Sequence, residues 1–132
     1  MRVKELVDAI RKITKTGINE TEAKTLLKEY GVPVVQEVAA KDRHEAVNAA
    51  DKLGYPVVVK GLGAELAHKT ERGLVHLDLH TPLAVESAIE AIKTSAGDEL
   101  DGFLVQPQVR GKRELVAGLF RDPQFGPVVM FG

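Results

Sequence analysis

Three side chains in the middle of the sequence could handle phosphate: Lys60, His68 and Lys69. Lys60 ends the apolar run 55–60, for which we expect a buried strand. A lysine at the end of a strand, next to a glycine-containing loop, is placed to offer its ammonium group to phosphate oxygens. A charged residue is also common where a strand simply runs into solvent. From this feature alone, Lys60 is either a phosphate ligand or a solvated strand end.

The segment that follows, residues 61–73, contains the glycines Gly61, Gly63 and Gly73. Glycines allow the backbone to approach a ligand closely, and exposed amides in such a turn suit an anion. The segment lacks the Gly-Lys-Ser/Thr ending of a P-loop. It is therefore either a cover for phosphates or a charged surface loop.

Histidines in and after this loop suggest two further kinds of chemistry. His68 can transfer a proton or attack a phosphoryl group near neutral pH, and Lys69 beside it would attract phosphate oxygens. A single loop histidine can also be merely solvated. His76 and His80 lie two positions on either side of Asp78. Alternation along an exposed strand face explains this spacing better than a metal site does.

Polar residues also follow an apolar run that predicts a strand at 103–109. Pro107 cannot continue the ladder of a central strand, so it predicts an edge strand or a hinge. Extended backbone at a hinge offers amide and carbonyl groups to an adenine ring. The residues of this candidate hinge are Gln106, Pro107, Gln108 and Val109. Glu114 could bind a ribose hydroxyl, a lysine or a metal, or it is a charged strand end.

Helices and strands that position these residues follow from apolar spacing and from Gly, Pro and capping residues at their ends. Helices are predicted at 3–13, 19–30, 42–53 and 82–96. Strands are predicted at 34–38, 55–60, 74–79, 103–109, 114–120 and 127–131. The order predicts a mixed α/β (α+β) fold.

Composition limits the kind of protein further. The chain has 132 residues, 44% of them hydrophobic, which fits one domain. Its 18 Lys and Arg against 19 Asp and Glu leave a net charge of −1, so no basic field predicts nucleic-acid binding. The absence of cysteine excludes disulfides and thiolate metal sites. No apolar run predicts a signal peptide or membrane span, so we expect a cytoplasmic location.

Several segments, taken in their order along the chain, match a known family more specifically than any single motif does. They are Glu22–Pro33, Gly54–Lys60, Ala67–Val75, Val105–Gln106, Gly111–Gly118 and Asp122–Gly132. Together they resemble the ATP-grasp region of the NDP-forming acyl-CoA synthetases, which include ADP-forming acetyl-CoA synthetase and are relatives of succinyl-CoA synthetase. The resemblance covers essentially the whole chain.

The resemblance implies that phosphoryl passes between ATP or ADP and a phosphohistidine or acyl-phosphate. It implies that Lys60 binds nucleotide phosphates, that His68 acts catalytically in handing on the phosphoryl group, and that Gln106–Val109 hold adenine. Gly61, Gly63, Lys69 and Glu114 match other positions of the nucleotide pocket. Residues 1–101 match the amino-terminal ATP-grasp subdomain, and 102–132 the start of the second.

Two departures from the family pattern leave the subfamily open. Gly61-Leu62-Gly63 stands where many members have Ser-Pro after the lysine, and Arg72-Gly73-Leu74 stands where many have Gly-Gly-Val. The acyl substrate is therefore open. The alternative is a regulatory nucleotide-binding module fused to a protein acetyltransferase.

The family pattern continues beyond Gly132 with the ligands of magnesium. We therefore expect ATP or ADP and Mg²⁺ as cofactors, with the Mg²⁺ ligands outside this chain and no turnover by the chain alone. The expected partner is the CoA-ligase domain or subunit, which carries the principal phosphohistidine. An incomplete second sheet would have an exposed edge, so oligomerisation is also expected.

Overall fold

A computed structural model of the chain describes residues 4–5, 7–8, 20–63 and 72–132. The helices are α2 (Glu20–Glu29), α3 (Arg43–Leu53), α4 (Pro82–Ala96) and the 3-10 turn η1 (Gly97–Glu99). The strands are β1 (Val38–Ala40), β2 (Val57–Leu62), β3 (Val75–Leu79), β4 (Gly102–Pro107), β5 (Ala117–Asp122) and β6 (Gly126–Phe131). The predicted mixed α/β fold is confirmed. Of the helix predicted at 3–13, the four described residues are helical, and the rest lies outside the described residues.

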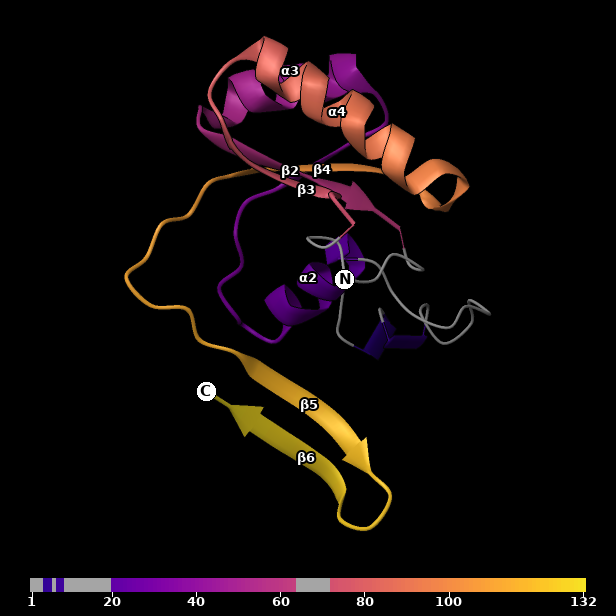
Figure 1. The fold of residues 1–132 in the computed structure, drawn as a ribbon. Coiled ribbons are helices and arrows are strands. Elements are labelled where there is room, and N and C mark those ends of the chain that lie inside the picture. Colours follow the sequence, from indigo (N-terminus) through magenta and orange to yellow (C-terminus); the bar gives the residue numbers. More distant parts are fainter. Residues whose placement is uncertain (1–3, 6, 9–19, 64–71) are drawn as a thin grey trace.

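Four strands form an antiparallel sheet in the order β1-β4-β2-β3, and β5 pairs with β6 in a separate antiparallel hairpin (Figure 1). Because β4 lies inside the sheet, Pro107 does not mark an edge strand, and that alternative is wrong. Pro107 is instead the last residue of β4. Proline has no N–H to donate to a neighbouring strand, and β4 ends at this residue, within the candidate hinge.

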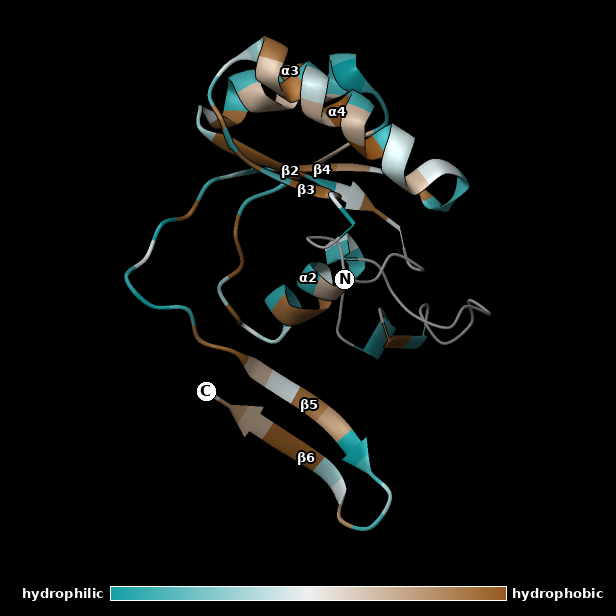
Figure 2. Ribbon diagram, viewed as in Figure 1, coloured by the Kyte–Doolittle hydropathy of each residue, from teal (hydrophilic) through white to brown (hydrophobic). Residues whose placement is uncertain are grey.

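One face of the four-stranded sheet packs against α3 and α4, which lie together above it, whereas α2 lies below (Figure 1). Side chains alternate along a strand, and Val57, Val59, Phe103 and Val105 all belong to the buried core on the side of α3 and α4. Hydrophobic residues accordingly concentrate along β2 and β4 beneath these helices (Figure 2). The opposite face carries the buried Val58 and Leu104 together with the polar Lys60 and Gln106.

Side-chain caps and glycines set the ends of α3 and α4, which lie close to the predicted bounds. Asp42 Oδ1 accepts a hydrogen bond from the Glu45 N–H at 2.9 Å, and Thr81 Oγ1 accepts one from the Ala84 N–H at 3.1 Å. Gly54 ends α3 with φ 90°, a conformation that favours glycine. None of the described helices is long and apolar enough to cross a membrane.

Several predicted strand bounds are wrong. The strand predicted at 55–60 is found at Val57–Leu62, so Lys60 does not end it, because Gly61 and Leu62 also pair with β4. The strand predicted at 34–38 is found at Val38–Ala40, because only these residues pair with β4. Residues 32–37 instead border α2, forming one wall of a groove of about 550 Å³. The strand predicted at 114–120 is found at Ala117–Asp122, because the Asp122 carboxylate accepts two backbone N–H bonds and starts the turn later than expected.

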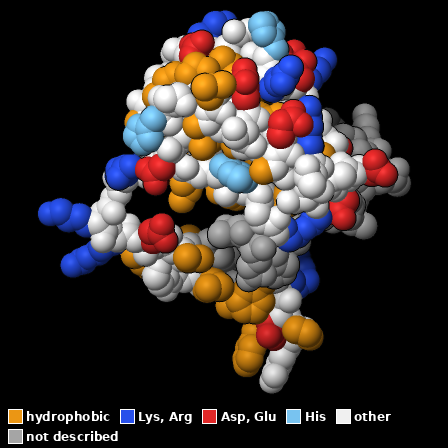
Figure 3. Space-filling view, turned by 45° about the horizontal axis from the view of Figure 1, so that its top comes forward, with side chains coloured by type: hydrophobic (Ala, Val, Ile, Leu, Met, Phe, Trp, Pro, Cys, Tyr) orange, Lys and Arg blue, Asp and Glu red, His pale blue; other side chains and the backbone are white. Residues whose placement is uncertain are grey.

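The β5–β6 hairpin exposes much apolar surface. Leu119, Phe125, Val129 and Phe131 are each more than 70% exposed. A space-filling view shows hydrophobic side chains gathered at the lower end of the molecule, where the hairpin lies (Figure 3). Two strands alone cannot bury both of their faces.

Candidate nucleotide site

Lys60 and Gln106 lie on the same face of the sheet. In the pairing of β2 with β4, Lys60 is opposite Leu104 and Val58 is opposite Gln106. Side chains alternate between the faces, and the odd-numbered residues of these strands point into the core. Lys60 and Gln106 therefore point to the other face, towards α2. The strand lysine and the first residue of the candidate hinge are thus near neighbours on adjacent strands.

Lys60 is held by an ion pair with α2. Its Nζ donates to Glu20 Oε1 at 2.8 Å, and the two side chains are 21% and 22% exposed. An ammonium group carries three N–H donors, so a bond to one carboxylate leaves it able to bind phosphate oxygens as well. Lys60 is therefore held in a fixed position and can still be reached from solvent.

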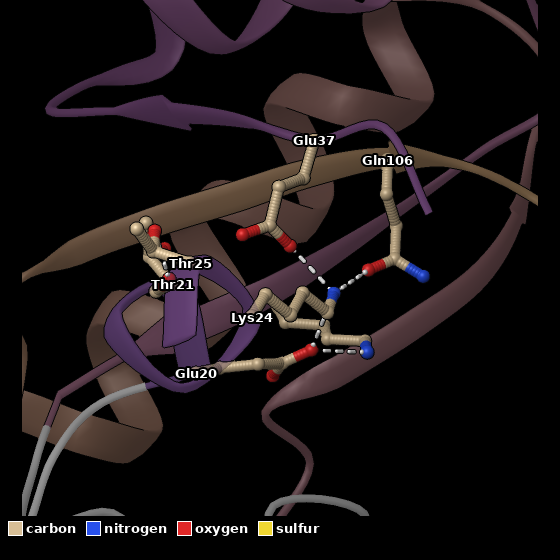
Figure 4. A network of polar contacts seen from close by, with 7 residues as sticks. Glu20, Thr21, Lys24, Thr25, Glu37 and Gln106 are labelled. Atoms are coloured by element: carbon tan, nitrogen blue, oxygen red, sulfur yellow. Dashed lines mark hydrogen bonds and ion pairs between the residues drawn. The ribbon is translucent and has the colours of Figure 1, made fainter. Parts of the chain in front are cut away.

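Lys24 lies at the centre of the same network, which joins side chains from α2, β2, β4 and the segment before β1 (Figure 4). Its Nζ donates to Glu37 Oε2 at 2.5 Å and to Gln106 Oε1 at 3.1 Å. It also lies 3.0 Å from Glu20 Oε1, the oxygen that Lys60 contacts. We call the five residues Glu20, Lys24, Glu37, Lys60 and Gln106 the α2 network. Two lysines and two glutamates make its formal charge zero.

The surroundings of Lys24 favour its charged form. Burial by itself would lower the pKa of the Lys24 ammonium, but its hydrogen bonds to Glu37 and Glu20 and the charges of these carboxylates raise the pKa above the ordinary value of 10.5. Lys24 is therefore a fixed positive charge at neutral pH.

A second cluster holds the residues that follow β4. Gln108 Nε2 donates to Asp78 Oδ1 at 3.0 Å, and the Asp78 N–H donates to Gln108 Oε1 at 2.7 Å. The Arg110 guanidinium also pairs with the Asp78 carboxylate. The Gln108 N–H donates to the Pro56 carbonyl at 3.1 Å. The candidate hinge is therefore fixed against both β3 and the start of β2.

The regular alternation predicted for His76, Asp78 and His80 is wrong. In the pairing of β2 with β3, Val57 is opposite Leu79 but Val59 is opposite His76, so the register shifts between them. Such a bulge turns side chains out of alternation. Asp78 has φ 54°, which aspartate tolerates better than most residues. Among the described residues, no group of three or more His, Cys, Asp or Glu side chains could hold a metal ion.

The other predicted site residues fall in different surroundings. Gly61 and Gly63 are buried, and the Gly61 N–H donates to the Leu74 carbonyl within the sheet rather than facing a ligand. Val109 is 70% exposed, and Glu114 is exposed in the irregular segment before β5. His68 and Lys69 lie outside the described residues.

Sequence reasoning gave no site role to Glu20, Lys24, Glu37 or Asp78. A signal existed for the first two, because a Glu and a Lys four residues apart on a helix are expected to pair. Nothing in the local sequence indicates that this pair meets Lys60 and Gln106, which lie 40 and 82 residues further along the chain.

Residues 9–132 match the family model described as the ATP-grasp domain, and the chain belongs to the ATP-grasp family. It is 34% identical over 133 residues to the subunit beta of acetate–CoA ligase (ADP-forming) II from Pyrococcus furiosus, covering 97% of this chain and 56% of the relative. It is 35% identical over 136 residues to 4-hydroxybutyrate–CoA ligase (ADP-forming) from Nitrosopumilus maritimus, covering 99% of this chain and 20% of the relative.

Solved structures agree with this assignment. The dinucleotide-forming acetyl-coenzyme A synthetase 1 of Ca. Korarchaeum cryptofilum, in complex with coenzyme A, Ca-AMPCP and HgCl+, matches with a TM-score of 0.86 and 37% identity over 98% of this chain and 58% of that chain. A structure of the same synthetase with coenzyme A and Mg-AMPPCP matches with a TM-score of 0.74 and 34% identity, covering 98% of this chain and 56% of that one. The resemblance to ADP-forming acyl-CoA synthetases is confirmed, and the chain spans little more than half of these structures.

Proposed function

We propose that this chain is the nucleotide-binding part of an ADP-forming acyl-CoA synthetase, in which phosphoryl passes between ATP or ADP and a phosphohistidine or acyl-phosphate. The observation that supports the proposal most is the placement of Lys60 and Gln106 on one face of adjacent strands. A phosphate ligand and an adenine hinge must lie within one nucleotide's length of each other, and this arrangement meets that requirement.

In this proposal Lys60 binds the phosphates, with Gly61, Gly63 and Lys69 beside it. Residues Gln106–Val109 hold the adenine, and Glu114 takes the acidic position of the pocket. His68 hands the phosphoryl group to or from the nucleotide. Phosphoryl transfer depends mostly on positioning and on neutralising charge, which lysines and Mg²⁺ supply.

Complete activity is proposed for this chain together with the CoA-ligase domain or subunit. The relatives in which ADP-forming CoA ligation is named are longer than this chain, and it spans 56% of one and 20% of another. The Mg²⁺ ligands and the phosphohistidine would come from outside residues 1–132. The acyl substrate is left open.

Titration of ATP against Lys60→Ala tests the proposal. A hydrogen bond to a charged group contributes about 1.5–3 kcal/mol, so the variant should bind ATP about tenfold more weakly, or worse. Lys93→Ala is the matched control, because Lys93 lies on α4, where it pairs with Glu90. Equal ATP affinity in wild type and Lys60→Ala would contradict the proposed role of Lys60.

A second assay separates the enzyme from the regulatory alternative. The chain is combined with its CoA-ligase domain or subunit, and ATP-dependent formation of acyl-CoA is measured. Turnover that Lys60→Ala abolishes supports the synthetase. ATP binding that depends on Lys60 without any turnover favours the regulatory module.

A further inference from the structure

We propose that Lys24 is a positioning residue that fixes both ends of the nucleotide site from α2. The inference rests on the proposed function, because it assumes that Lys60 and Gln106 bind nucleotide. Lys24 contacts Gln106 directly and reaches Lys60 through the shared Glu20 oxygen. One ammonium group therefore links the phosphate-binding strand to the first residue of the hinge.

The geometry uses the full donor capacity of this lysine. An ammonium group has three N–H donors, and Lys24 has three acceptors, on Glu37, Gln106 and Glu20. Its side chain is 19% exposed, and that of Glu37 is 12% exposed. Water can therefore replace these contacts only in part. Loss of Lys24 would leave the largely buried Glu37 carboxylate without its main counter-charge.

Lys24 also determines how Glu20 acts on the phosphate site. With Lys24 present, Glu20 orients Lys60 while its negative charge is balanced by a second lysine. Without Lys24, the formal charge of the α2 network changes from zero to −1, next to the place where triphosphate binds. The Glu20 carboxylate would then repel the phosphates at short range.

Lys24 also acts on the hinge, through its hydrogen bond to Gln106. The Lys24 ammonium donates to Gln106 Oε1, which fixes the orientation of the amide at the point where β4 ends. Gln108, two residues further on, is held independently by Asp78. Loss of Lys24 would therefore release the first residue of the hinge while the rest stays in place.

The test measures the ATP dissociation constant by titration calorimetry for Lys24→Met, in the chain with its CoA-ligase domain or subunit. We expect binding at least tenfold weaker, and recovery of most of this loss in Lys24→Arg, which keeps the charge. Lys28→Met is the matched control, because Lys28 lies one turn further along α2 and is exposed. It should bind ATP within twofold of wild type.

A double-mutant cycle with Glu20→Gln distinguishes positioning from a general loss of stability. If Lys24 acts through Glu20, Lys24→Met should weaken ATP binding by at most threefold in the Glu20→Gln background. A full tenfold effect in both backgrounds, or no effect in either, overturns the inference. Thermal unfolding monitored in parallel shows that each variant is folded at the temperature of the titration.

Two further comparisons complete the design. If Lys24→Met does not fold, the same cycle is run with Lys24→Gln, which keeps an N–H donor and removes the charge. Weaker binding in Lys60→Ala with normal binding in Lys24→Met overturns only the role of Lys24. Normal binding in both variants contradicts the proposed function itself.

Discussion

Replacement of Asp78 by alanine should destabilise the chain, because Asp78 both tolerates a left-handed backbone and anchors the residues after β4. An alanine at φ 54° costs about 1 kcal/mol more than an aspartate there. Loss of the bond from Gln108 costs about 0.5–1 kcal/mol. The Arg110 pair adds only about 0.5 kcal/mol, since both side chains are more than half exposed. The sum is roughly 2 kcal/mol.

A series of three substitutions separates these contributions. Asp78→Asn keeps the tolerance for φ 54° and an oxygen for Gln108, so it should cost only about 0.5 kcal/mol. Asp78→Gly removes the backbone strain together with the side chain, so its cost should be about 1 kcal/mol. Alanine, with both losses, should be the least stable.

Urea unfolding of the four chains measures these differences, and thermal unfolding gives an independent reading. For a chain of this size the alanine variant should melt roughly 6–10 °C below wild type. Equal stability of Asp78→Ala and Asp78→Asn would refute the reasoning, because it would show that the left-handed backbone at this position carries no cost. A Glu90→Ala variant on α4, where the Glu90 side chain is 58% exposed, serves as control for loss of a carboxylate.

Three further predictions concern groups away from the nucleotide site. Burial, together with the hydrogen bond to Asp51 and its charge, raises the pKa of Tyr55 to about 12. The protonated Tyr55 hydroxyl therefore contributes fully to stability below pH 10, and this contribution is lost as the pH rises towards 12. In a Tyr30→Phe background, absorbance titration should show this pKa, and Asp51→Asn should lower it towards 10; an unchanged pKa would contradict the cause given. Asp42→Ala should cost about 1 kcal/mol in unfolding free energy by removing the cap of α3, whereas Asp42→Asn should cost little; equal losses would exclude the cap as the reason. Ile89 is fully buried, so Ile89→Val should cost about 0.5–1.5 kcal/mol by thermal unfolding, and a neutral result would mean that the core repacks around the lost methyl group.

The helices show why local sequence suffices for some elements. Asp42, Gly54, Thr81 and Gly97 act on backbone groups within four residues of themselves, so their effect can be read without knowledge of the fold. Both α3 and α4 begin and end within one residue of the bounds predicted from the sequence. The apolar run before Lys60 likewise predicts the buried strand β2, but β2 continues for two residues beyond the charge.

Strand bounds depend on distant partners, and here the predictions were less accurate. Val34 has the β-branched side chain of a strand residue, but in the described part of the chain this segment pairs with β4 only from Val38 onwards. The bulge at Asp78 likewise results from the register between β2 and β3. Propensity describes how one residue fits a sheet, whereas pairing depends on what lies opposite.

The sequence by itself determined that Lys60 lies in a buried strand, that a glycine-containing segment follows this strand, and that Pro107 interrupts a second apolar strand. These features follow from side-chain volume, alternation and the missing N–H of proline. Only the tertiary structure decided that Glu20 and Lys24 of α2 meet Lys60 and Gln106. The reason is that a charged side chain can pair with any opposite charge, and the partner that it finds depends on how helix and sheet pack.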